Sequence, residues 1–313
     1  MENNSPMVFK TRENPAASSI LIIIGLFLVN FLFLGSIVQL VVMVAAGASL
    51  QDLLNSGGDF SKLPNAWLGM ILGQGIGSFV GFIGTAWFYW RIIEKKQWSE
   101  LNFSPLPKLN IFFMVILIEF TFMGFNGWLQ EINQNFVFPE PLKSLEAILK
   151  GMEDKLAEAT KFFTTFTSFW QFILAFIVIA VIAGIGEELV FRGLLMRKLF
   201  LGIKNIHVAI WLAGFIFAVI HFQFYGILPR MMLGVLFGYL YYWTGNIWVP
   251  IVAHIFNNGL AIVLMYLYNL KIIKTDLESM DKMPTPIIFF SLFATIGLMF
   301  LFKNYIDKQA TQS

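Results

Sequence analysis

Eight apolar stretches, each about as long as the hydrocarbon core of a bilayer is thick, divide this chain of 313 residues. An α-helix needs about 20 apolar residues to cross that core. The predicted spans are residues 18–46, 66–91, 109–130, 165–186, 206–223, 227–244, 247–269 and 285–302. The sixth and seventh are the hardest to separate, because Thr244 to Asn246 is the only turn signal between them. The sequence therefore predicts an all-α fold, a polytopic membrane helix bundle with about eight transmembrane helices.

Composition agrees with a chain surrounded by membrane lipid. Hydrophobic residues make up 58% of the chain and charged residues 13%, whereas soluble domains carry about a quarter charged residues. The net charge of +2 argues against a nucleic-acid partner. The chain has no cysteine, which excludes disulfides and thiolate metal sites. We expect a single integral membrane domain over residues 1–313, whose first apolar run is a retained span rather than a signal peptide.

The distribution of Lys and Arg predicts the orientation in the membrane. With eight crossings, most of the basic residues next to spans fall on one side, and that side is expected to be cytoplasmic. They are Lys10, Arg12, Arg91, Lys95, Lys96, Lys108, Arg192, Arg197, Lys198, Lys204, Lys303 and Lys308. The sequence thus predicts that both termini are cytoplasmic, in the cytoplasmic membrane of a bacterium.

Two patterns predict how helices pack. Gly69, Gly73, Gly77 and Gly81 recur every four residues and place a smooth stripe on one helix face, which we expect to pack within the molecule. Residues 144–163 alternate apolar and charged positions with helical spacing. That pattern predicts an amphipathic helix that lies on the outer face of the membrane that the bundle crosses.

The stretch GEELVFRG, residues 186–193, places ionisable groups next to an apolar run. Such groups are costly in lipid and usually face the bundle interior. Glu188 and Arg192 are four residues apart and can pair on one helix face, whereas Glu187 lies about 100° around the helix. Taken alone, the pattern fits either a buried ion pair with one juxtamembrane glutamate or a site in which Glu187 is left available. We expect residues 186–200 to form one continuous helix, with the site some way below the cytoplasmic surface.

The chain has three histidines, and two of them lie in predicted spans. The sequence FAVIH places Phe217 and His221 on one face, and HIFNN places His254 and Asn258 on one face. His207 stands at a helix start and is expected to be interfacial. Two intramembrane histidines near a double glutamate favour a chemical site over packing alone.

Together these motifs resemble those of a known family. EELVFR (187–192) is similar to the EExxxR motif of the type II CAAX prenyl protease and bacteriocin-processing (CPBP, or Abi-like) intramembrane proteases. FAVIH (217–221) and HIFNN (254–258) resemble the FxxxH and HxxxN motifs of the same family. The motifs occur in the family's order, within a core of residues 165–265.

The resemblance implies an endopeptidase that cuts a membrane-associated protein or peptide. It implies Glu187 as the general base for a water, and His221 as a group that holds this water or a metal. It implies His254 and Asn258 as donors to the oxyanion, with Glu188 and Arg192 supporting these residues. Peptide hydrolysis needs such a base and such donors.

The role of a metal stays open at this stage. Glu187, His221 and His254 could form a zinc site with an open fourth position. There is no HExxH motif, however, and if Glu187 bound zinc the base would have to be Glu188, which Arg192 neutralises. A metalloprotease and a metal-free glutamate mechanism are therefore both compatible with the sequence.

Two other functions compete with proteolysis. A membrane immunity or scaffold protein of the same fold would act by binding alone, but it would not need the full set of Glu187, His221, His254 and Asn258. A small-solute transporter would use the same charges as a pathway, and Glu119 in the third span favours it. We expect Glu119 instead to line the same cavity or to pair with Arg192. Neither the substrate's identity nor its prenylation follows from the sequence.

Overall fold

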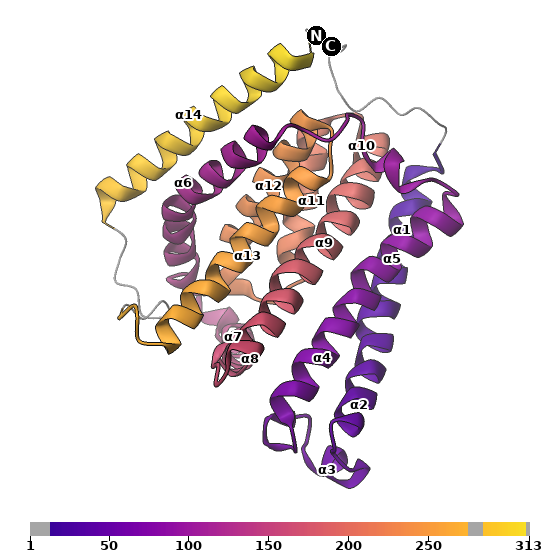
Figure 1. Cartoon of the computed structure of the whole chain (residues 1–313), viewed down its shortest axis with the longest axis vertical. Coiled ribbons are helices and arrows are strands. Elements are labelled where there is room, and N and C mark those ends of the chain that lie inside the picture. The colour runs from indigo at the N-terminus through magenta and orange to yellow at the C-terminus, as the bar shows by residue number, and fades with distance from the viewer. Residues whose placement is uncertain (1–12, 275–283, 311–313) are drawn as a thin grey trace.

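A computed structural model describes residues 13–274 and 284–310 of the chain, and Lys10 and Arg12 lie outside this part (Figure 1). The described residues form helices and no strands. The helices are α1 (Ala16–Leu28), α2 (Gly35–Ala45), α3 (Leu50–Asn55), α4 (Ala66–Ser78), α5 (Thr85–Trp87), α6 (Leu109–Gln134), α7 (Lys143–Thr164), α8 (Phe169–Ala175), α9 (Ala183–Glu188), α10 (Arg197–Ile203), α11 (Ile206–Val219), α12 (Ile227–Thr244), α13 (Trp248–Asn269) and α14 (Thr285–Ala310). Wider π-helical turns join several of these into continuous rods, namely Ala16–Ala45, Ala66–Ile93 and Phe169–Ile203.

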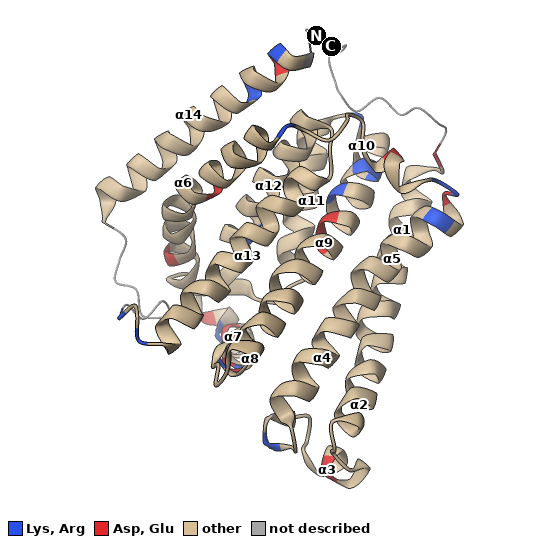
Figure 2. Cartoon of the chain, in the orientation of Figure 1, with Lys and Arg blue, Asp and Glu red and all other residues tan. Residues whose placement is uncertain are grey.

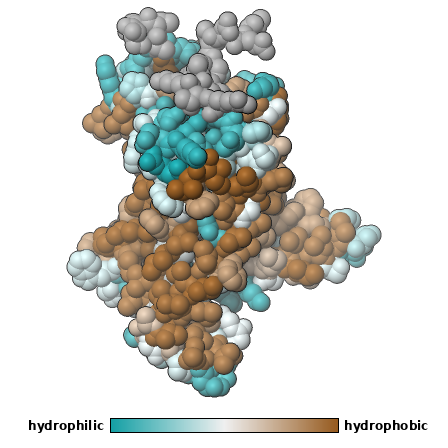
Figure 3. Space-filling model, turned by 90° about the vertical axis from the view of Figure 1, so that its right-hand side faces the viewer, coloured by the Kyte–Doolittle hydropathy of each residue, from teal (hydrophilic) through white to brown (hydrophobic). Residues whose placement is uncertain are grey.

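The predicted all-α membrane bundle is confirmed. Seven helices in the described part of the chain are long and apolar enough to cross a bilayer. Figure 3 shows the broad hydrophobic surface that these helices present, with hydrophilic residues gathered toward one end of the molecule. Figure 1 shows that α1 begins and α14 finishes at this same end of the bundle.

The fourth span is longer than predicted. It runs from Phe169 to Ile203, over 35 residues, rather than over 165–186. The apolar count ended the span at the first carboxylates, but Glu188 is paired with Arg192 inside the protein. The helix continues through residues 186–200, as expected, and on to Ile203. Arg192, Arg197 and Lys198 are therefore buried residues of this helix and do not lie between the fourth and fifth spans, where the orientation argument had counted them. Glu187 consequently lies near the middle of the rod.

The fifth span is shorter than predicted. The sequence indicated a crossing over 206–223, but α11 has only 14 residues, fewer than a straight crossing needs. The helix stops because the chain turns back after Val219, and Phe222 adopts a left-handed backbone conformation with φ of 54°. It packs tightly against α12, since a Cβ on Gly234 would lie 2.9 Å from the Cα of Gly214.

The glycine stripe packs within the molecule, as predicted. A Cβ added to Gly69 would lie 2.6 Å from Met43 Sδ, and one added to Gly81 would lie 2.6 Å from Phe31 Cδ2. Gly77 meets the backbone of Gly35 on the first rod. The rods Ala16–Ala45 and Ala66–Ile93 thus form a close helix pair, which stands at one side of Figure 1.

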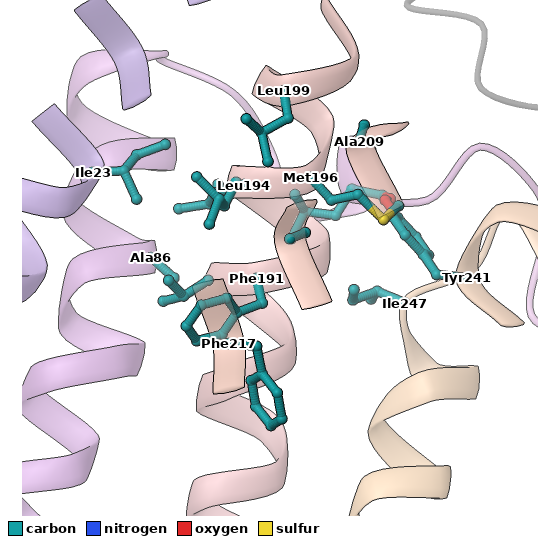
Figure 4. Close-up of a cluster of buried hydrophobic side chains, with 14 of the residues drawn as sticks. Ile23, Ala86, Phe191, Leu194, Met196, Leu199, Ala209, Phe217, Tyr241 and Ile247 are labelled. Atoms are coloured by element: carbon teal, nitrogen blue, oxygen red, sulfur yellow. The ribbon is translucent and has the colours of Figure 1, made fainter. Parts of the chain in front are cut away.

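The long fourth span is fixed to its neighbours by a buried hydrophobic cluster and by ion pairs beyond it. Figure 4 shows the cluster, in which side chains of the fourth span such as Phe191 and Met196 meet residues of α11 and α12 such as Phe217 and Tyr241. Nearer the end of the rod, Arg197 and Lys198 bind the carboxylate of Glu13.

These ion pairs determine the ionisation of Glu13, which precedes the first span. Burial opposes ionisation of its carboxyl group, but the opposite charges of Arg197, Lys198 and Lys96 outweigh this effect and lower the pKa. The carboxylate is therefore held ionised against the end of the fourth span, which helps to fix the rod on which the site is built.

The amphipathic segment is also helical. α7 spans Lys143–Thr164, close to the predicted 144–163. Leu145, Ile148, Met152 and Leu156 stay largely exposed along one face of α7. An exposed apolar stripe opposite charged residues fits a helix that lies in a membrane interface.

Candidate active site

Glu187, His221 and His254 come together in the structure from three separate segments. Glu187 lies on α9, His254 on α13 and His221 in the turn that follows α11. The Nε2 atom of His254 is 3.7 Å from Glu187 Oε2, and the Nε2 atom of His221 is 4.0 Å from the same oxygen. Figure 2 shows the acidic residues of α9 within the bundle, beyond which basic residues follow on α10. The fold thus brings one carboxylate to face two imidazoles.

Glu188 supports this centre from the neighbouring helix position. Its Oε1 accepts hydrogen bonds from Arg192 Nη1 at 2.5 Å and from His254 Nδ1 at 2.8 Å. Arg192 also donates from Nη2 to the carbonyl oxygen of Gly234 at 2.9 Å. The predicted pairing of Glu188 with Arg192 is therefore present, and it extends to His254 and to α12.

The partners of both histidines determine which ring nitrogen faces Glu187. His221 Nδ1 lies 2.7 Å from the carbonyl oxygen of Phe217, which can only accept, so this nitrogen carries hydrogen. His254 Nδ1 must likewise donate to the carboxylate of Glu188. In the neutral rings, both Nε2 atoms are therefore acceptors, and both point toward Glu187 Oε2. That oxygen is buried and has no hydrogen-bond partner.

Small residues let the surrounding helices approach this centre. A Cβ on Gly184 would lie 2.9 Å from Ile255, and a Cβ on Gly186 would lie 2.7 Å from Phe82. Gly184 and Gly186 therefore allow close contact on both sides of Glu187. Gly193 leaves ordinary contact distances instead. The rings of Phe217 and Phe237 cover the guanidinium of Arg192 at 4.9 and 5.3 Å.

Asn258 lies one helical turn beyond His254 and faces the fourth span. Its Nδ2 donates to the carbonyl oxygen of Ile179 at 3.2 Å, within a π-helical segment of that span. Its Oδ1 accepts a hydrogen bond from Asn257. The amide thus has one further N–H group available, and its observed bonds fix the register between α13 and the fourth span.

Two other polar residues stand apart from the three central groups. Glu119 on α6 is buried with an unpartnered Oε1, and it lies close enough to Glu188 for their charges to repel. Its predicted pairing with Arg192 is not found, because Arg192 bonds to Glu188 and Gly234. His207 lies at the start of α11, exposed and in contact with the hydroxyl of Tyr239, so it takes no part in the site.

The three residues can be tested as zinc ligands. Ligands at 2.0–2.1 Å from a tetrahedral zinc are about 3.3 Å from each other. The two histidine nitrogens lie farther than this from Glu187 Oε2. Over residues 13–274 and 284–310, no three His, Asp or Glu side chains are grouped closely enough to hold a metal ion. The side chains as placed therefore do not form a metal site.

The sequence analysis assigned no role to three polar residues that lie near the centre. Arg230 in the first turns of α12 lies close enough to Glu187 and His221 for its charge to act on both. Gln223 and, on α7, Glu153 connect to it through hydrogen bonds. An arginine within the apolar stretch ILPRMM was a signal for such a role, because intramembrane charges are usually functional.

Fold and site together define a polytopic membrane protein with a carboxylate–imidazole centre inside its helix bundle. Residues 169–260 match the family described as type II CAAX prenyl endopeptidase Rce1-like. This match confirms the family resemblance that the three motifs predicted, over the part of the chain that carries them.

Two curated relatives match part of the chain. The uncharacterized protein YpbD of Bacillus subtilis (strain 168) is 34% identical over 82 residues, which cover 25% of this chain and 39% of YpbD. The membrane-embedded CAAX protease MroQ of Staphylococcus aureus (strain USA300) is 31% identical over 94 residues, which cover 28% of this chain and 38% of MroQ. The chain thus matches about two fifths of the length of each relative. No solved structure matches it.

Proposed function

We propose that the protein is an intramembrane endopeptidase of the CAAX prenyl protease type, which hydrolyses a peptide bond in a membrane-associated protein or peptide. The observation that carries this proposal is the buried, unpartnered Oε2 of Glu187, which faces two imidazole nitrogens. Separations of 3.7 and 4.0 Å are too long for hydrogen bonds, and polar groups at such distances are commonly bridged by water. The family match over residues 169–260 supports the same activity.

Glu187 acts in this proposal as the general base. It takes a proton from a water that His221 Nε2 also holds, and the water oxygen attacks the peptide carbonyl carbon. When the tetrahedral intermediate collapses, the carbon–nitrogen bond breaks and Glu187 returns the proton to the leaving amine. Glu187 suits this role because Glu188 is already bound to Arg192 and His254.

His254 and Asn258 stabilise the oxyanion in the same proposal. His254 would donate from Nε2 toward the developing charge when its ring carries a second proton, while Nδ1 keeps its hydrogen bond to Glu188. Asn258 would use the N–H group that Ile179 leaves free. Each donor of this type contributes about 2.7–4 kcal/mol to lowering the barrier in other hydrolases.

The activity can be tested with purified protein in liposomes and a library of synthetic single-span peptides. We expect new peptide termini, identified by mass spectrometry, in the presence of the wild-type protein. Liposomes with the Glu187→Gln protein provide the control for contaminating proteases. The absence of cleavage of every peptide by a well-folded protein would favour a binding role instead.

The metal question has its own expected result. Because Glu187 is better placed as a base than as a ligand, we expect full cleavage in excess chelator and no stoichiometric metal in the purified protein. Elemental analysis and a chelator titration measure this directly. Stoichiometric zinc that is lost in His221→Ala, together with chelator-sensitive activity restored by zinc, would show that a metal takes part.

We also propose that both termini face the cytoplasm of a bacterium. The start of α1 and the end of α14 lie at one end of the bundle, which supports a common side for both (Figure 1). Since the chain has no cysteine, single cysteines can report on the two sides. In intact cells we expect an impermeant thiol reagent to label Lys150→Cys on α7 and to spare Lys108→Cys. The reverse pattern would invert the orientation.

A further inference from the structure

Arg230 presents a guanidinium group beside the proposed catalytic centre. Its Nη2 donates to Gln223 Oε1, whereas its Nη1 is buried without a hydrogen-bond partner. Gly226 makes room for the group, because a Cβ at that position would lie 2.0 Å from Nη1. The guanidinium is thus held in place on one side and left unsatisfied on the other.

The charges around Arg230 do not neutralise it directly. Glu187 and Glu153 both lie within electrostatic range of the guanidinium. Neither forms an ion pair with it in the described part of the chain, and Glu153 instead accepts a long hydrogen bond from Gln223 at 3.4 Å. His221, which is the most exposed of the three central side chains at 27%, also lies within electrostatic range of Arg230.

Arg230 is partly buried, and a charged side chain whose N–H group is buried without an acceptor is destabilised unless a ligand supplies one. The planar fork of a guanidinium fits a carboxylate, and the charge-assisted bonds that result are strong and directional. We propose that Arg230, positioned by Gln223, binds a carboxylate of the peptide substrate beside the bond that is cut. This rests on the proposed peptidase function and names the chemical class of the substrate, an apolar peptide that carries a carboxylate near the cleaved bond.

Binding to the inactive Glu187→Gln protein tests this inference separately from catalysis. The probes are a fluorescent apolar hexapeptide with a free terminal carboxylate, the same peptide as a carboxamide, and a carboxamide that ends in aspartate. We expect the free acid to bind at least roughly tenfold more tightly than the plain carboxamide, because hydrogen bonds to charged groups are strong. Tight binding of the aspartate peptide as well would identify a side-chain carboxylate as an equivalent ligand.

Three variants in the same background identify the responsible group. Arg230→Gln should reduce the ratio of acid to amide affinity to about one. Gly226→Ala keeps the charge but displaces the guanidinium, so it should lose the same preference with little change in unfolding temperature. Lys150→Gln removes an exposed cation on α7 and should keep the preference.

The outcomes separate the two proposals. Equal affinity for acid and amide, or an equal loss of preference in Lys150→Gln, would overturn the role of Arg230. Preference kept in Gly226→Ala but lost in Arg230→Gln would show a general charge effect rather than a positioned site, and would also overturn it. If the wild-type protein cleaves none of the three peptides although the preference in binding is present, the proposed peptidase function fails and the carboxylate site stands.

Discussion

Replacing Glu187 with glutamine should lower peptide cleavage by a factor of at least about 10², because the variant keeps the shape of the side chain and loses the base. The unfolding temperature should stay close to that of the wild-type protein, since Glu187 Oε2 forms no hydrogen bond that the change would break. The measurement is turnover of the best-cleaved library peptide, with thermal unfolding of both proteins in the same detergent.

Glu158→Gln is the matched control, because it removes a carboxylate from the exposed surface of α7. It should leave both turnover and stability unchanged. Cleavage by purified Glu187→Gln at nearly the wild-type rate would remove Glu187 from the mechanism, whatever the stability of the variant.

Arg192→Ala should destabilise the fold by about 3–5 kcal/mol, because it leaves one partner of a buried ion pair uncompensated. Arg192 connects Glu188 on its own rod to the Gly234 carbonyl of α12. Its guanidinium also packs between the rings of Phe217 and Phe237. Equilibrium unfolding in detergent measures the loss, and activity should fall with it, because Glu188 also orients His254.

Lys155→Ala on the exposed surface of α7 serves as the control for loss of a cation, and it should change stability little. A fully stable but inactive Arg192→Ala protein would contradict the structural role. That result would mean that Arg192 acts on the substrate itself.

The sequence was most informative where local spacing determines contacts. The four-residue spacing predicted the Glu188–Arg192 pair, and the glycine spacing predicted the close packing of the first two rods. Both follow from helix geometry alone, since residues four apart share a face.

The end of the fourth span could not be located in the same way, although residues 186–200 were expected to form one continuous helix. Counting apolar residues ended the fourth span at Gly186, because the count cannot show that Glu188 and Arg192 neutralise each other inside the bundle. Their pairing lets the helix continue to Ile203 and places Glu187 near its middle. The end of the span therefore depends on tertiary contacts rather than on composition.

The surroundings of His221 also depend on tertiary structure. Helical spacing placed it on one face with Phe217, and its ring does bond to the Phe217 carbonyl, but the helix ends before it. Residues 220–223, where the helix ends, include no glycine or proline to signal a turn, and Phe222 adopts a left-handed conformation there. The link from Arg230 through Gln223 to Glu153 spans distant segments and has no local sequence pattern.

The origin of the oxygen atom in the product tests most directly whether Glu187 activates water. The measurement is a single-turnover cleavage in ¹⁸O-labelled water with excess protein, followed by mass spectrometry of the new carboxyl terminus and of the fragment that contains Glu187. We expect one labelled oxygen in the new terminus, none in Glu187, and no labelled product with Glu187→Gln. Label in the Glu187 side chain would show a covalent intermediate, and labelled product from Glu187→Gln would show that another group activates the water.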